Sequence, residues 1–171
     1  MAAINKENKR GFLLAEETLK IIIAVICVIF LVYLLAALYN SHSSDKKLNQ
    51  AKDILTGTDE DSRSIEGIIL SLKEGGNEIK DISDPSGWHL YSFVGQEKPN
   101  SCLNQRCLCI CQKSFIERIN SQAEKCDDDG VCLVVPNLAA SEIDLKIGQG
   151  KKALFLEIKK QNGKVFIEEK I

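Results

Sequence analysis

Between positions 21 and 39 the chain reads IIIAVICVIFLVYLLAALY, nineteen residues without a charged or strongly polar side chain. Neither Pro nor Gly interrupts the run, so nothing in it opposes a continuous helix. A helix of this length extends about 30 Å, which matches the hydrocarbon core of a bilayer. The run therefore predicts one transmembrane helix, with all the residues that follow it held on one side of a membrane.

Three kinds of protein carry such a run: a protein with an uncleaved signal anchor, a secreted protein with a cleaved signal peptide, and a pilin-type subunit. A cleaved signal peptide has an apolar region of about 7–15 residues followed by a small-x-small cleavage site. Here the run is longer and ends in AALYN at residues 36–40, a poor version of that site. This difference disfavours the cleaved peptide and leaves the other two kinds open.

A short motif lies directly before the run. Residues 9–16 read KRGFLLAE, so Phe12 follows Gly11, and Glu16 is the fifth residue counted from Phe12. The motif resembles the class III signal of type IV pilins and related archaeal and bacterial filament proteins. The resemblance implies that a prepilin-type peptidase cuts between Gly11 and Phe12 and that Glu16 guides assembly.

The physical reason for such a glutamate is charge compensation. A carboxylate at the edge of an apolar helix is costly to bury alone, and a positive partner makes it tolerable. The resemblance implies that this partner is the free amine of a neighbouring subunit's first residue. Glu17 and Lys20 depart from the family pattern by adding a second acid and a positive charge at the start of the run. The resemblance is confined to residues 9–39.

Charge and composition bound the function. Lys6, Lys9 and Arg10 precede the run. This excess of positive charge favours an N-terminus in the cytoplasm, with the run crossing the cell membrane and the head outside the cytoplasm. After residue 40 the chain has 18 Lys and Arg against 21 Asp and Glu, without a basic block for binding nucleic acid. Catalytic motifs are absent, and His42 and His89 are the two histidines. We therefore expect no enzymatic activity, no cofactor and no nucleic-acid partner.

Six of the seven cysteines fall within residues 102–132, whereas Cys27 lies in the apolar run. An even number clustered in a small extracytoplasmic domain predicts a disulfide framework. Within residues 107–111 three cysteines alternate with aliphatic residues, so on a strand their sulfurs would share one face. Neighbours on one face are poorly placed to bridge each other. We therefore expect Cys107, Cys109 and Cys111 to pair with Cys102, Cys126 and Cys132, in an order that the sequence leaves open.

Metal binding and thiol redox catalysis are alternative uses of these cysteines. Zinc sites pair ligands as Cys-x2–4-Cys, a spacing that Cys102 and Cys107 fit only loosely. A thioredoxin-like site needs Cys-x-x-Cys at a helix start, and that motif is absent. Residues 127–130, Asp-Asp-Asp-Gly, lack the alternating acids of an EF-hand and predict a solvated turn. The sequence therefore predicts no metal site.

Hydrophobic periodicity predicts helices first and strands afterwards. A helical pattern continues through residues 45–55, and a second helix is expected to start at Thr58. Further on, alternation predicts strands at residues 78–82, 88–94, 107–111, 131–135 and 143–147, with a short helix at 114–125. Asn162-Gly163 separates residues 153–160 from 164–169 and predicts a hairpin with a type I′ turn.

The predicted fold is α+β, with a leader at residues 1–11, an N-terminal helix at 12–56 containing the transmembrane segment 21–39, and an extracytoplasmic head at 57–171. The head would hold a shorter helix and an antiparallel sheet of about five or six strands with a disulfide-rich region. Our leading hypothesis is a membrane-anchored, pilin-like structural subunit that contacts lipid, a prepilin-type peptidase and copies of itself or related subunits. The alternatives are a signal-anchored domain that binds a partner without polymerising and a membrane-tethered metal or redox protein.

Overall fold

The computed structural model of the chain describes residues 8–57, 63–113, 121–148 and 152–170. Contacts divide the chain into two units, Met1–Ser44 and Asp45–Ile171. We call the second unit the head and describe each unit by itself.

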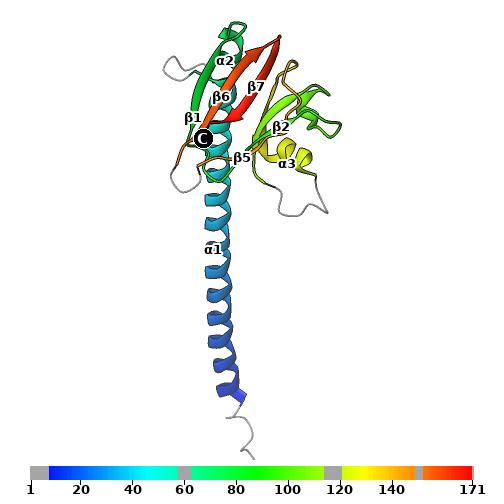
Figure 1. Cartoon of the computed structure of the whole chain (residues 1–171). Helices are drawn as coiled ribbons and strands as arrows, with labels where there is room; N and C mark the ends of the chain where they lie inside the picture. The colour runs from blue at the N-terminus through cyan, green and yellow to red at the C-terminus, as the bar shows by residue number, and fades with distance from the viewer. Residues whose placement is uncertain (1–7, 58–62, 114–120, 149–151, 171) are drawn as a thin grey trace, which may run out of the picture. The chain divides into compact units, whose positions relative to one another are not determined.

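Helix α1, Asn8–Thr56, is the longest element and is drawn as one coil in Figure 1. Its apolar run is open to the surroundings, with Ile21 63% exposed and Tyr33 70% exposed. Such a continuous apolar surface is far larger than soluble monomers present to water. Within the described residues, α1 is the one helix long and apolar enough to span a membrane.

The last turns of α1 belong to the head. Ala51 and Leu55 are fully buried in its main core, where they join helix α2, Ile65–Ser71. The Oγ of Ser64 accepts a backbone hydrogen bond in the first turn of α2 and caps it. The expected helix start at Thr58 lies outside the described residues.

The described strands form two antiparallel sheets, and Figure 1 shows the strands of the first sheet beside one another. The first sheet has the order β1–β6–β7, with β1 at Asn77–Ile82, β6 at Leu154–Gln161 and β7 at Lys164–Glu169. The hairpin between β6 and β7 turns at Asn162 and Gly163, whose φ angles are 53° and 72°. The Asn-Gly pair predicted these positive values, and the hairpin is confirmed.

The second sheet has the order β4–β3–β2–β5. Its strands are β2 (His89–Phe93), β3 (Cys107–Cys111), β4 (Gly130–Val134) and β5 (Asp144–Lys146). The expected single sheet of five or six strands is therefore wrong. The reason is that β1 pairs with the distant β6, so the strands between them in the chain pair among themselves.

Strand β3 lies between β2 and β4 and is buried on both faces. Leu108 and Ile110 point into the main core, which the two sheets share with α1 and α2. The three cysteines of β3 point into a second cluster that also contains Tyr91. The predicted separation of aliphatic and sulfur faces is confirmed.

The triple aspartate does not form the expected solvated turn. Asp127, Asp128 and Asp129 are the last residues of helix α3, Gln122–Asp129, and β4 starts at Gly130. A Cβ at Gly130 would lie 2.6 Å from the Cβ of Cys111, so a close approach between segments requires this glycine. The carboxylate of Asp127 accepts hydrogen bonds from two backbone amides at the start of the short helix η1, Asn100–Cys102.

We expect Asp127→Ala to lower the free energy of unfolding by about 2 kcal/mol, because both amides lose a charged acceptor. Burial raises the pKa of Asp127, but the hydrogen bonds from Ser101 and Asn100 outweigh it and leave the pKa below its usual value. Its stabilisation is therefore present above about pH 4 and is lost as the pH falls through the lowered pKa of the folded state.

Chemical denaturation of the detergent-solubilised full chain near neutral pH and in acid measures both effects. Asp128→Ala is the matched control, because Asp128 is exposed at the adjacent position. We expect the control to change stability by less than about 0.5 kcal/mol. Equal losses in the two variants would contradict the anchoring role of Asp127.

Candidate functional site

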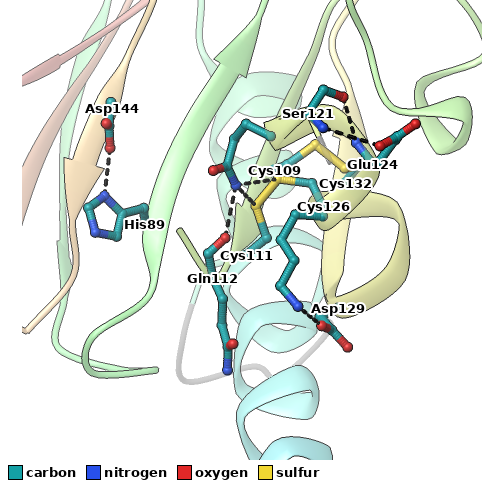
Figure 2. Close-up of a disulfide and its surroundings, with 12 residues drawn as sticks. His89, Cys109, Cys111, Gln112, Ser121, Glu124, Cys126, Asp129, Cys132 and Asp144 are labelled. Carbon is teal, nitrogen blue, oxygen red and sulfur yellow. Dashed lines mark hydrogen bonds and ion pairs between the residues drawn. A yellow bond between two sulfur atoms is a disulfide. The ribbon is translucent and has the colours of Figure 1, made fainter. Parts of the chain in front are cut away.

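Three disulfides among the described residues leave β3 toward three different elements. They join Cys107 to Cys102 of η1, Cys109 to Cys132 of β4, and Cys111 to Cys126 of α3. The latter two bonds are visible in Figure 2. Each bond pairs one cysteine of the strand with one outside it, so β3 is covalently fixed to η1, β4 and α3.

The register of β3 and β4 explains the Cys109–Cys132 bond. The amide of Val135 donates to the carbonyl oxygen of Arg106, and hydrogen-bonded pairs recur at every second position from there. Cys109 and Cys132 therefore oppose each other at a non-hydrogen-bonded position, where side chains approach most closely. Their Cα atoms are 4.1 Å apart.

Two of the disulfides contact each other. The Sγ of Cys109 lies 3.9 Å from the Sγ of Cys102 and 3.9 Å from the Sγ of Cys107. The three sulfurs all lie within 4.8 Å of one another, a spacing that could hold a metal ion. Metal binding requires thiolates, however, and here each sulfur is part of a disulfide. A soft metal would fit this cluster only after both bonds are reduced.

His89 belongs to an ionic network at the edge of the second sheet. The Nδ1 of His89 lies 2.6 Å from Oδ1 of Asp144, a residue of β5. The other carboxylate oxygen of Asp144, Oδ2, lies 3.3 Å from Nζ of Lys113. Burial raises the pKa of Asp144, but these two partners outweigh it and leave the pKa below its usual value. The imidazole meets Asp144, not a sulfur (Figure 2), so the arrangement is not a His–Cys pair.

The aromatic neighbour of His89 is not an activated nucleophile. Tyr91 stacks on His89 with ring centroids 5.6 Å apart. Burial, and then the negative charge of Asp144, raise the pKa of the Tyr91 hydroxyl. The hydroxyl therefore stays protonated at physiological pH, and its oxygen is buried without a hydrogen-bond partner in the described structure.

From the sequence, His89 was noted only as one of two histidines outside any catalytic motif, and Asp144 and Lys113 were not singled out. These residues come together only because β5 pairs with β2 across the sheet. The local sequence around each one carries no signal of that pairing.

The residues of the signal motif, Gly11, Phe12 and Glu16, lie within α1, which begins at Asn8. Their side chains are outside the described set. The motif therefore precedes the exposed apolar run on the same helix.

No known protein family, curated protein or solved structure matches this chain.

Proposed function

We propose that this protein is a membrane-anchored, pilin-like assembly subunit with a disulfide-braced head outside the cytoplasm. The observation that carries the proposal is α1. This one helix contains the Gly11–Phe12 motif, the exposed apolar run and, at Ala51 and Leu55, turns that are buried in the head. An apolar helix surface of this length needs lipid or other apolar helices around it.

Assembly would proceed through α1. Removal of residues 1–11 frees the amine of Phe12, and the carboxylate of Glu16 on a neighbouring subunit compensates that charge. Residues 12–39 of successive subunits then contact one another in place of lipid, and the charge pair fixes their register because an unpaired charge in apolar surroundings is strongly disfavoured. The disulfides, at about 2–4 kcal/mol each, stabilise a head whose core is small.

The processing step gives the first test. We expect the protein taken from its native membrane to begin at Phe12 and to lack residues 1–11. Intact-mass spectrometry and N-terminal sequencing measure this directly. The matched pair of variants is Gly11→Leu, expected to keep the leader, and Ala15→Leu, expected to be processed normally. A wild-type chain that begins at Met1 or Ala2 would contradict the pilin-like role.

A signal-anchored, partner-binding protein is the second candidate, and one feature of the head favours it. A cavity of about 270 Å³ is lined by residues of α2, β4 and the β6–β7 hairpin. One of these residues, Leu70 of α2, is 77% exposed, so an apolar side chain is available for contact. An unprocessed N-terminus together with a monomeric protein in detergent would favour this candidate over assembly.

A further inference from the structure

The six bridged cysteines, all of which lie in described residues, differ in exposure. Five of them are at most 1% exposed: Cys102, Cys107, Cys109, Cys111 and Cys126. Cys132 is partly exposed on β4, an edge strand of the second sheet. Cys132 is therefore the one bridged cysteine that keeps solvent-exposed surface.

This position determines which sulfur leaves when the bond is attacked. A thiolate cleaves a disulfide by bonding to one sulfur and expelling the other. Attack on Cys132 from solvent expels the thiolate of Cys109, which lies on the interior strand β3. Both sulfurs of each of the other two bonds belong to buried residues, so their attack requires opening of the cluster.

The expelled thiolate would already have a second disulfide beside it. The Sγ of Cys109 lies 3.9 Å from each sulfur of the Cys102–Cys107 bond, that is, beside the bond. Once the Cys109–Cys132 bond is broken, rotation of the Cys109 side chain has to bring its sulfur into line with that bond for attack. We propose that Cys132 is a modification site for external thiols, and that the Cys109 thiolate released there passes the exchange to the Cys102–Cys107 bond. This inference does not depend on whether the protein assembles.

The two steps balance without an added oxidant. In the first, a thiolate RS⁻ bonds to Sγ of Cys132, the Cys109–Cys132 bond breaks, and Cys109 leaves as a thiolate. In the second, Cys109 bonds to Sγ of Cys102 or Cys107, their bond breaks, and the other of the two leaves as a thiolate that takes a proton from solvent. A monothiol leaves a mixed disulfide on Cys132, whereas a dithiol then releases Cys132 as a thiol and is itself oxidised to a disulfide.

The third disulfide is placed differently. The side-chain amide of Gln122 donates to the sulfurs of Cys111 and Cys126 at 3.5 and 3.6 Å and to the carbonyl oxygen of Gln112 at 2.8 Å. Gln122 therefore lies against this bond on α3, and both of its cysteines are buried. We expect the Cys111–Cys126 bond to stay intact while the other two exchange.

The test uses the full-length protein in detergent with the Cys27→Ser substitution, which removes the one cysteine outside the disulfides. The folded protein is pulsed with reduced glutathione, quenched in acid, alkylated and mapped by mass spectrometry. We expect glutathione on Cys132 at a level about tenfold above that on Cys111 or Cys126, since attack there needs no opening of the core. We also expect a free thiol on Cys102 or Cys107 and a new bond from Cys109 to the other.

Two variants isolate the second step. In the double variant Cys102→Ala/Cys107→Ala, the free thiol is expected to remain on Cys109. In the matched control Cys111→Ala/Cys126→Ala, the exchange is expected to proceed as in the parent. A thiol on Cys109 with Cys102–Cys107 intact in the parent would overturn the transfer. If glutathione first modified Cys111 or Cys126, or if no adduct formed before global unfolding, the assignment of Cys132 would be overturned. The adduct site and the new disulfide are both measured in the Cys27→Ser parent, so they test the proposal even if a variant fails to fold.

Discussion

Glu16→Ala is expected to leave membrane insertion intact and to abolish assembly, whereas Glu17→Ala is expected to leave both nearly unchanged. The substitution removes the carboxylate that would pair with the Phe12 amine of a neighbouring subunit. Breaking a buried ion pair costs about 3–5 kcal/mol, which lowers each association constant by at least about a hundredfold. Repeated at every contact of a filament, such a loss leaves no stable polymer.

Glu17 is the matched control, because it is the same residue type one position further along α1. On a helix, consecutive residues point about 100° apart, so the two carboxylates cannot take the same place in an interface. Membrane fractionation measures insertion, and chemical cross-linking in native membranes followed by sedimentation measures assembly. An assembled Glu16→Ala protein, or equal defects in the two variants, would remove the main support for the pilin-like role.

Leu55→Ala is expected to lower the free energy of unfolding of the head by about 3–5 kcal/mol, whereas Leu48→Ala is expected to lower it by less than about 1 kcal/mol. Leu55 is fully buried in the main core, and its truncation leaves a cavity among well-packed neighbours. Leu48 lies two turns earlier on α1 and is 37% exposed.

Thermal unfolding of the detergent-solubilised full chain, followed by near-ultraviolet circular dichroism, measures this difference. Membrane insertion is expected to be the same for both variants, because neither substitution changes the apolar run at residues 21–39. Similar losses for the two leucines would mean that the last turns of α1 are not part of the core of the head.

The sequence was most informative where one segment determines its own structure. The Asn162-Gly163 pair predicted a turn with two positive φ angles, and the alternation in residues 107–111 predicted a strand with separate sulfur and aliphatic faces. Each of these features depends on local backbone geometry.

Features that depend on distant partners could not be predicted. Alternation marks a strand but does not name its neighbour, so the pairing of β1 with β6 was missed and one sheet was expected in place of two. The same limit applies to the disulfides, since the Cys109–Cys132 bond follows from a register that only the folded sheet defines. Asp127 was assigned to a solvated turn because its hydrogen-bonding partners, Asn100 and Ser101, lie far back in the chain.

The arrangement of the disulfides around β3 affects what happens when a protease cuts the chain. The Cys111–Cys126 bond closes a loop that lies within the longer loop closed by Cys109–Cys132. A protease that cut the chain between Cys111 and Cys126 would leave two fragments still joined by two covalent bonds. A head nicked in this segment would therefore remain one molecule attached to α1.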